Sequence, residues 1–418
     1  MMGNIQDGIY YNKPVGNSFC LLFLKISKSV HTSDFAKDLS ELWKVYEGLK
    51  VGKLNDLDIQ TNHHNHGNLS VLIGYGPKLF DGIVLGLKKK KPTDLIHEKG
   101  FRGPNISSGE AIAFGSGINF SRDIIKNHAP ENHIIIQFIA DFEMVTNLAI
   151  VETWKFIKKR QSPILKISNF YTGFKRSDQR GWLGFHEGIS NIPKKDREDV
   201  IAIKNTSLPN QDKWLENGTY MAFIRFIIDL EKWETLSLHE QEIIIGRKKT
   251  TGCPLIGFDK NGNPIGDPDC PIPGTNEVIE AGNEKFREHK PADEKNIPSP
   301  GMYKSLSKSH IYKVHKSDNH RSEDFKSFRI FRQGFEFLES YEKYPGFRAG
   351  LNFVSFQNKP QNIMKILTLP HWLGRSANTN YYGKVSGLES FISARAAGIF
   401  LVPPSIKNES FPGSVMFS

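Results

Sequence analysis

Apolar and polar positions along the first 160 residues alternate in stretches that fit strands followed by helices. A strand is predicted over residues 19–26, and Ser33 is a candidate N-cap for the helix that follows. The apolar residues of that helix lie on one face; they are Phe35, Leu39, Leu42, Trp43 and Tyr46. Further strands are predicted over 71–75 and 134–142, and a second helix over 143–159, whose apolar residues lie about three positions apart.

The second half of the chain repeats this order. Strands are predicted over 219–228 and 351–357, and a helix begins at Pro360 and runs over 360–367. Residues 257–301 are rich in Gly, Pro, Asn and Asp, which predicts a long irregular excursion. The pattern therefore favours an α+β fold built from two units, each a sheet covered by helices.

Length and composition fit a folded protein of two domains. A chain of 418 residues exceeds the size at which a single hydrophobic core stops growing, and 38% hydrophobic with 24% charged residues is ordinary for a globular protein. No apolar stretch approaches the roughly 20 residues of a membrane helix, so we expect no membrane partner. Residues 1–7 lack a basic start followed by an apolar block, and the expected location is therefore cytoplasmic.

Cysteine usage and charge bear on compartment and partners. Cys20, Cys253 and Cys270 have no CxxC spacing, so reduced thiols are expected in place of a disulfide framework or a structural zinc site. The net charge of +10 could favour nucleic acid. However, the one dense basic run, 88–91, has no interleaved aromatic residues and precedes Pro92, so we expect a solvated loop and no nucleic-acid partner.

Three segments carry residues suited to acid–base and metal chemistry. The segment 184–191 reads GFHEGISN and places Glu187 between closely spaced glycines, which suggests positive φ angles or a close approach of the backbone to a ligand. A carboxylate can take up and return a proton, a guanidinium such as that of Arg332 can donate hydrogen bonds to developing charge, and an imidazole such as that of His310 can bind a metal. Taken singly, each could also be an ordinary turn carboxylate, strand-face ion pair or surface histidine.

Together with other segments, these resemble the motifs of DyP-type (dye-decolorizing) haem peroxidases in the order of that family. Residues 184–188 resemble its GxxDG motif, with glutamate in place of aspartate. Other likenesses occur over 71–81 (an N-domain strand and turn), 218–221 and 240–249 ("GSY…EQE…IGR"), 310–313 ("HIRK"), 329–334 ("RIIRRG") and 350–357 ("GLAFVAYQ").

The resemblance implies two ferredoxin-like βαββαβ domains, as in dimeric α+β barrels, with haem b in the C-terminal one. Residues 1–180 would form the N-terminal domain, 181–215 a connecting segment with the GxxEG motif, and 216–418 the haem-binding domain. By the same resemblance His310 would be the proximal iron ligand. His315 and His320 are nearby competitors for that role.

The resemblance also assigns roles on the opposite side of the haem. Glu187 would be the acid/base for hydrogen peroxide, and Arg332 would stabilise charge on it. Residues expected to contact the cofactor are Gly188, Ile189, Asn191, Arg247, Leu351 and Phe353. Arg247 could bind a haem propionate or be a surface arginine, and Leu351 and Phe353 could narrow the peroxide pocket or be ordinary core residues.

Two functions stay open on the sequence. The first is a haem b peroxidase that reduces hydrogen peroxide and oxidises aromatic or dye-like donors, with a rate or pH profile altered by the longer glutamate. The second is a haem protein without peroxidase activity, which carries haem or releases its iron. A homo-oligomer is an option that the sequence leaves open.

Overall fold

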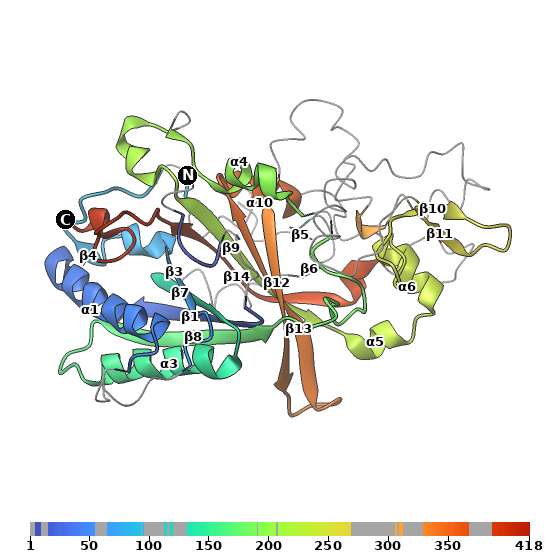
Figure 1. The fold of residues 1–418 in the computed structure, drawn as a ribbon, viewed down its shortest axis with the longest axis horizontal. Helices are drawn as coiled ribbons and strands as arrows, with labels where there is room; N and C mark the ends of the chain where they lie inside the picture. The colour runs from blue at the N-terminus through green and yellow to red at the C-terminus, as the bar shows by residue number, and fades with distance from the viewer. Residues whose placement is uncertain are drawn as a thin grey trace.

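Eight strands form a closed barrel in the computed structural model (Figure 1), in the order β1-β7-β3-β14-β9-β13-β12-β8. The structure describes residues 5–9, 16–54, 65–92, 94–95, 113–114, 118–119, 132–189, 191–205, 208–268, 306, 309–311, 329–367 and 387–418. All neighbouring strands in the barrel pair antiparallel.

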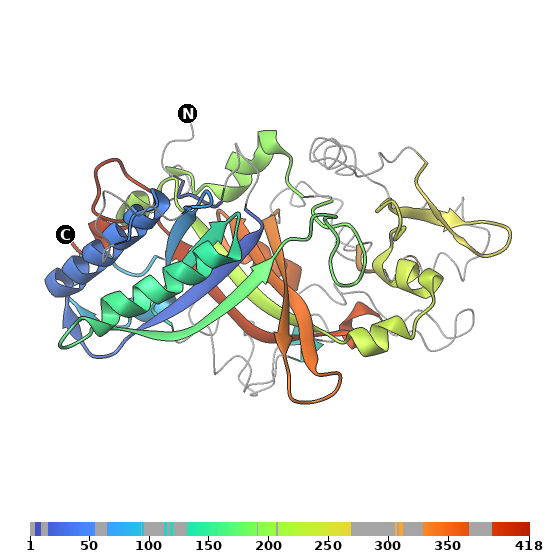
Figure 2. The ribbon, with the colours of Figure 1, turned by 60° about the horizontal axis from the view of Figure 1, so that its bottom comes forward.

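The N-terminal half is a βαββαβ unit with the strand order β8-β1-β7-β3. Helices α1 and α3 lie side by side on the outer surface of these strands (Figure 2). Its elements are β1 (Ser18–Ile26), α1 (Thr32–Lys50), β3 (Ser70–Tyr75), β7 (Ile134–Ala140), α3 (Glu143–Lys158) and β8 (Leu165–Phe174).

The C-terminal half repeats the arrangement with the order β14-β9-β13-β12. Its elements are β9 (Thr219–Ile228), α5 (Leu230–Glu234), α6 (Leu238–Ile245), β12 (Phe331–Ser340), β13 (Phe347–Gln357), α10 (Pro360–Leu367) and β14 (Ile392–Val402). The halves meet where β3 pairs with β14 and where β8 pairs with β12. The expected α+β fold with two ferredoxin-like units is confirmed.

Shorter elements connect these units. They are β2 (Val30–His31), β4 (Val84–Leu85), β5 (Ala113–Phe114), β6 (Ile118–Asn119), α4 (Arg197–Ile201), β10 (Leu255–Phe258), β11 (Pro264–Gly266) and the short 3₁₀ turns η1 (Pro77–Phe80), η2 (Lys194–Asp196), η4 (Asn210–Leu215), η7 (Leu388–Ser390) and η8 (Ser414–Met416). Strands β10 and β11 form a hairpin at the start of the excursion predicted over 257–301. The prediction of irregular chain was therefore wrong for its first residues, and 269–301 lie outside the described part.

Strand alternation separates two cores. Side chains of one parity on β12 and β13 point into the barrel, where Phe331, Phe335, Val354 and Phe356 join a single apolar cluster. The other parity faces outward, toward the layer between the C-terminal sheet and its helices, where Leu351 and Phe353 pack against a second cluster. This outward face of β12 and β13 is where the candidate site forms.

Three details of the predicted elements were wrong. Helix α1 begins at Thr32 with His31 at the N-cap position, so Ser33 lies in the first turn and is not the cap. On α3 Val145 is buried, but Val151 and Trp154 are 45% and 54% exposed, because steps of three residues rotate by about 300° and drift around the helix. Strands β8 and β12 were not predicted at all.

The cysteines also differ from expectation. Cys253 is disulfide-bonded, whereas Cys20 is a buried free thiol whose pKa is raised by burial. The expectation of three reduced thiols was therefore wrong. Disulfides persist mainly in oxidising compartments, so this bond gives the expected cytoplasmic location no support. Within the described ranges, no helix has the length and apolar content needed to cross a bilayer.

Candidate active site

The register of β12 against β13 brings the family-motif residues onto one surface. Arg332 pairs with Ser355, Gly334 with Phe353, and Glu336 with Leu351. Residues directly opposite each other in an antiparallel pair point to the same side of the sheet. The outward face therefore carries a guanidinium, a bare glycine and a carboxyl group beside two apolar side chains.

Glu187 reaches this face from a tight loop. The loop closes through hydrogen bonds from Gly181 N to Phe185 O (3.0 Å) and from Glu187 N to Gln179 O (2.9 Å). Gly184 and Gly188 have φ of +85° and +80°, a conformation that other residues adopt only with strain. Positive φ thus accounts for the glycines on both sides of Glu187, as the motif suggested.

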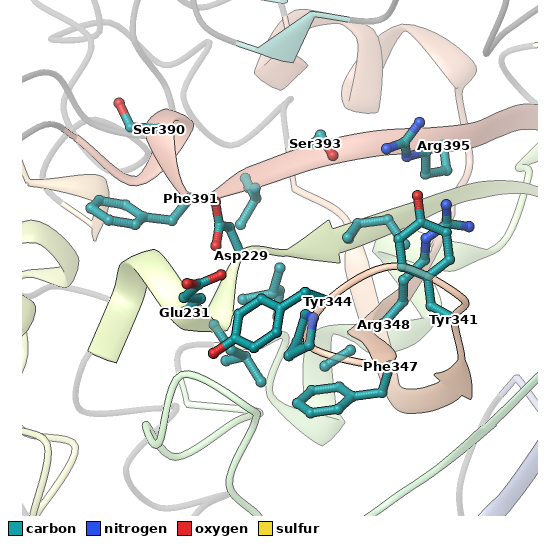
Figure 3. Close-up of a pocket in the computed structure, with 16 residues that line it drawn as sticks. Asp229, Glu231, Tyr341, Tyr344, Phe347, Arg348, Ser390, Phe391, Ser393 and Arg395 are labelled. Atoms are coloured by element: carbon teal, nitrogen blue, oxygen red, sulfur yellow. The ribbon is translucent and has the colours of Figure 1, made fainter. Parts of the chain in front are cut away.

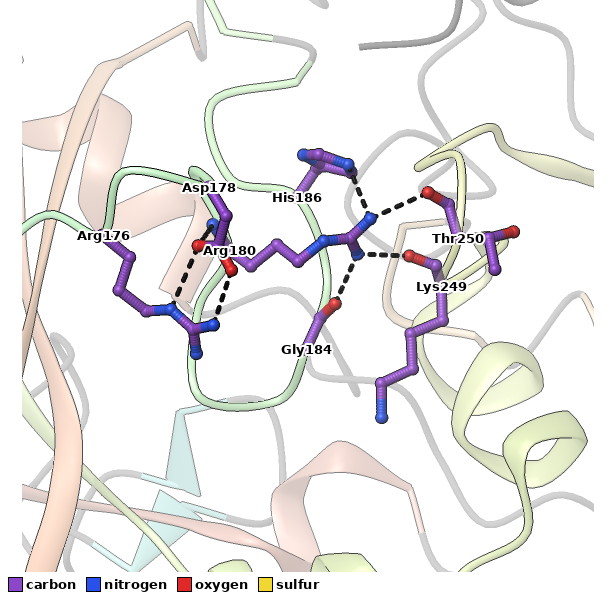
Figure 4. A network of polar contacts seen from close by, with 7 residues as sticks. All are labelled: Arg176, Asp178, Arg180, Gly184, His186, Lys249 and Thr250. Atoms are coloured by element: carbon purple, nitrogen blue, oxygen red, sulfur yellow. Dashed lines mark hydrogen bonds and ion pairs between the residues drawn. The ribbon is translucent and has the colours of Figure 1, made fainter. Parts of the chain in front are cut away.

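Arg180 ties this loop to the turn after α6 (Figure 4). Its Nη1 donates to the carbonyls of Gly184 (2.7 Å) and Lys249 (2.5 Å), and its Nη2 donates to Thr250 O (2.8 Å) and to His186 Nε2 (2.8 Å). The His186 imidazole accepts this bond, and burial followed by the nearby Arg180 charge lowers its pKa. The sequence carried no signal for Arg180, because three of its partners are backbone carbonyls.

Two glycines leave room for the Glu187 carboxylate. A Cβ built on Gly181 would lie 2.8 Å from Glu187 Oε1, and one built on Gly334 would lie 3.2 Å from Glu187 Oε2. Two half-buried cations are near it. Burial lowers the pKa of both Lys175 and Arg332, and the negative charge of Glu187 acts in the opposite direction on each. Glu187 and Arg332 are therefore brought within electrostatic reach of each other.

Arg332 is fastened to the segment after Glu187. Its backbone N–H donates to Asn191 Oδ1 (3.0 Å), and Asn191 Nδ2 donates back to Arg332 O (2.8 Å). Its Nη2 donates to Ile189 O (3.1 Å). The segment with Gly188, Ile189 and Asn191 thus holds the loop that carries Glu187 against β12, the strand that carries Arg332.

The end of α6 positions Arg247. Ser237 and Glu240 form a capping box at the start of the helix, and Gly246 ends it at φ +90°. The fully buried Glu242 accepts hydrogen bonds from Lys248 Nζ (2.6 Å) and Lys249 N (2.9 Å), which folds the following turn back onto the helix. Within the "EQE…IGR" stretch, the carboxylates therefore shape the turn.

Arg247 follows a turn that packs on the segment with His310. Burial, and then the charge of Arg332, lower the pKa of Arg247, so Arg332 lies within electrostatic reach of Arg247. A Cβ on Gly246 would lie 2.6 Å from Ser309 Oγ, which shows that the His310 segment packs directly on this turn. His310 itself is half-buried. Its competitors His315 and His320 lie outside the described residues.

The structure adds two residues that sequence reasoning missed. Glu336 is buried on the outward face of β12, and Lys175 follows β8 within electrostatic reach of Glu187. Glu336 had a signal, because it lies four residues after Arg332 and an alternating strand places both on one side. Lys175 had none, since its strand was not predicted.

A separate pocket of about 330 Å³ lies near the tip of the β12–β13 hairpin (Figure 3). Ala349 lines it, six residues before the partner of Arg332, so roughly 20 Å of strand separates the two. Arg348 stacks 3.5 Å over the Tyr341 ring, and its hydrogen bond lowers the pKa of that phenol. Polar and aromatic residues in the lining include Asp229, Glu231, Tyr341, Tyr344, Arg348 and Arg395.

The protein is an α+β barrel made of two ferredoxin-like halves. The outward face of its second half carries a carboxylate and an arginine. The family model described as Dyp-type peroxidase, C-terminal, matches residues 178–407, more than half of the chain. The chain belongs to the Dyp-type peroxidase family.

Individual relatives match over shorter stretches. The chain is 35% identical to a dye-decolorizing peroxidase of Mycobacterium tuberculosis over 92 residues, 22% of this chain and 25% of that protein. It is 26% identical to a deferrochelatase of Shigella flexneri over 195 residues, 45% of this chain and 41% of that protein. The matches thus span between a quarter and about two fifths of these relatives.

Solved structures match over nearly the whole chain. A DyP-type peroxidase from Cellulomonas bogoriensis aligns with a TM-score of 0.66 and 18% identity, covering 99% of this chain and 96% of that one. A DyP-type peroxidase from Streptomyces coelicolor gives a TM-score of 0.70 at 20% identity, covering 100% and 96%. At such identities the likeness establishes the fold.

Proposed function

We propose that the protein is a haem b peroxidase that reduces hydrogen peroxide and oxidises aromatic, dye-like electron donors. The observation that carries this proposal is the half-buried Glu187 carboxylate within electrostatic reach of Arg332, on a surface shared with Leu351 and Phe353. Family membership supports it, as does the name of the mycobacterial relative, a dye-decolorizing peroxidase.

The donor set around this surface fits an iron porphyrin. His310 offers a half-buried imidazole on a segment packed against Gly246, where a Cβ would collide with its neighbours. Arg247 is a buried guanidinium group, which suits the carboxylate of a haem propionate. Leu351 and Phe353 supply an apolar wall. The haem, when bound, would supply the redox chemistry that amino-acid side chains lack.

The protein's own contribution is proton transfer and charge stabilisation. Glu187 would accept the proton from one oxygen of the peroxide and return it to the other, which leaves as water. Arg332 donates N–H groups and keeps its charge, so it would stabilise negative charge on the departing oxygen. The segment with Gly188, Ile189 and Asn191 would fix the Glu187 carboxylate and the Arg332 guanidinium relative to each other. The side chains of Leu351 and Phe353 would exclude water.

The pocket near the hairpin tip suits the aromatic donor. Tyr341 and Tyr344 offer rings for stacking, and Arg348 and Arg395 offer positive charge to a sulfonate or phenolate group. We therefore propose that bulky anionic aromatic donors dock there, away from the peroxide.

A second candidate function rests on the deferrochelatase relatives, which match 45% of the chain. In that case the protein would bind haem for transport or for release of its iron. The outward face of β12 would then hold the porphyrin without promoting peroxide cleavage.

The deciding experiment is rapid mixing of the haem-reconstituted protein with one equivalent of peroxide. The peroxidase proposal expects a fast change in the haem absorption spectrum that is slowed strongly in Glu187→Gln, and recovery of the starting spectrum when an aromatic donor is added. An unreactive spectrum, or equal rates in Glu187→Gln and the parent, would favour the haem-carrier function. His310→Ala is expected to lose stoichiometric haem; a histidine-ligated spectrum in that variant would reassign the ligand.

Other sequence expectations stay proposals. We propose the domain bounds 1–180, 181–215 and 216–418, supported by β8 ending at Phe174 and β9 beginning at Thr219. Limited proteolysis would test them through cleavage within 181–215. A cytoplasmic location and a homo-oligomeric state remain predictions, which cell fractionation and light scattering address.

A further inference from the structure

Two carboxyl groups meet on the outward face of β12. Glu336 is only 3% exposed, and its Oε1 lies 2.8 Å from the position that a Cβ on Gly181 would take. Glu187 Oε1 lies at the same 2.8 Å from that position, and the two carboxyl groups share a hydrogen bond. The glycine at 181 is thus what allows two acidic side chains to touch.

A negative charge on the buried Glu336 would be costly, because repulsion from the Glu187 carboxylate adds to the cost of burying that charge. The hydrogen bond between them requires a proton on one oxygen. Among the described residues, Glu336 Oε2 is buried without any hydrogen-bond partner, so an ionised Glu336 would leave charge on an oxygen that nothing solvates. These facts favour the proton on Glu336.

The surrounding charges point the same way. Lys175 and Arg332 interact electrostatically with Glu187, whereas Glu336 receives a backbone hydrogen bond from Trp182 and, as its smallest contribution, the charge of Arg176. Burial, and then the charge and hydrogen bond of Glu187, raise the pKa of Glu336 well above the usual range of a carboxyl group. Glu336 therefore holds its proton tightly beside the Glu187 carboxylate.

We propose that Glu336 is a positioning residue that keeps a proton on this carboxyl pair and fixes the Glu187 carboxylate by donating an O–H hydrogen bond to it. The inference rests on the proposed acid/base role of Glu187. Glutamate has one more rotatable bond than the aspartate of the family motif, and this hydrogen bond removes that freedom. Glu336 thereby compensates for the longer side chain.

Proton counting is consistent with this role. The resting pair holds one proton and one negative charge. When Glu187 takes a proton from the peroxide, the pair holds two protons and no charge, and it returns to one proton when Glu187 passes the proton to the leaving oxygen. The Glu336 proton is not consumed. If it is lost at alkaline pH, the two carboxylates repel each other and Glu187 leaves its position.

The test uses infrared and kinetic measurements on two variants of the haem-loaded protein. Glu336→Gln keeps a hydrogen-bond donor but cannot titrate, and Glu336→Leu removes the donor. Glu409→Gln is the matched control, since Glu409 is a half-buried carboxyl with a raised pKa in a different part of the chain. We expect a protonated-carboxyl band that persists above neutral pH in the parent and in Glu409→Gln and is missing in Glu336→Gln.

For the rate of reaction with peroxide, we expect a decline at alkaline pH in the parent that Glu336→Gln abolishes, with similar rates near neutral pH. Glu336→Leu is expected to be roughly tenfold slower at neutral pH with an unchanged haem spectrum. Identical infrared bands in the parent and Glu336→Gln would overturn the proposal, as would an unaltered pH profile in Glu336→Gln. If Glu187→Gln leaves the rate unchanged while the infrared difference is present, the pair exists and the acid/base role of Glu187 fails instead.

Discussion

Replacing Gly334 by alanine tests whether the bare backbone of β12 is needed to place the Glu187 carboxylate. The new methyl group would lie 3.2 Å from both Glu187 Oε2 and Leu351 Cδ1. Carbon contacts normally lie at about 3.5–4.0 Å, so its neighbours must yield by roughly 0.3–0.5 Å. Leu351 belongs to a paired strand, whereas Glu187 extends from a loop, so the carboxylate is expected to move.

The size of the effect follows from that displacement. A misplacement of about 1 Å at a reacting group costs on the order of 100-fold in rate, so a few tenths of an ångström correspond to roughly three- to tenfold. Global stability should change by less than about 1 kcal/mol, since alanine is preferred to glycine in a strand and this offsets the crowding. Gly334→Ala should therefore fold normally and react slowly.

The assay is the second-order rate of reaction with peroxide, normalised to bound haem, together with denaturant unfolding. Gly48→Ala is the control, because its methyl group would meet only Lys53 atoms, the nearest at 3.5 Å. In a double-mutant cycle, Gly334→Ala should cause little further loss once Glu187 is glutamine, since both changes act through one carboxylate. A parental rate in Gly334→Ala, or full additivity in the cycle, would refute the reasoning.

Three further outcomes are expected. Glu242→Leu removes the buried acceptor of Lys248 and should lower the free energy of unfolding by about 2–3 kcal/mol, measured by denaturant unfolding. It should also weaken haem retention, measured by haem-transfer titration. Unchanged values would show that the turn after α6 does not depend on the Glu242 carboxylate. Burial, and then neighbouring lysines, lower the pKa of His133 to about 4, below its value in the unfolded chain, so the stability that this neutral histidine provides above pH 6.5 is lost as the pH falls toward 4. The loss of stability should be roughly 2 kcal/mol after solvent screening. It should be absent in His133→Gln, which keeps an acceptor for the Ile26 N–H. If both proteins lose the same stability in acid, a group other than His133 is responsible. Arg348→Gln should raise KM for an anionic aromatic donor about fivefold at low salt and leave the peroxide step unchanged, whereas an equal loss with uncharged donors would argue against charge recognition.

Local patterns predicted those elements whose burial leaves a period in the sequence. The five apolar residues of α1, from Phe35 to Tyr46, are all buried, and α10 has the predicted bounds 360–367. Strand β8 was missed because only two of its ten residues are buried and its apolar pattern is weak. Its pairing partners, β1 and β12, come from opposite halves of the chain, and such long-range pairing has no local signature.

The candidate site divides in the same way. Glu187, Arg332 and the glycines at 184 and 188 follow from motif spacing and from the backbone conformation that glycine permits. The residues that interact with Glu187 could not be predicted from motif spacing. Lys175 and Glu336 lie 12 residues before it and 149 after it, and only the closure of the barrel between β8 and β12 brings them to one carboxylate.

The sequence by itself predicted a strand-and-helix order in each half, and its motifs pointed to the acid, the arginine and the histidine as candidates, because periodicity, turn-forming glycines and ordered motifs are written in neighbouring residues. Only the tertiary structure decided which charges face which. Strand register set Glu336 and Gly334 beside Glu187, and the folded turn after α6 set Arg247 within electrostatic reach of Arg332. The physical reason is that burial and proximity, which govern the ionisation of a carboxyl pair, are properties of chain segments that meet only when the barrel is closed.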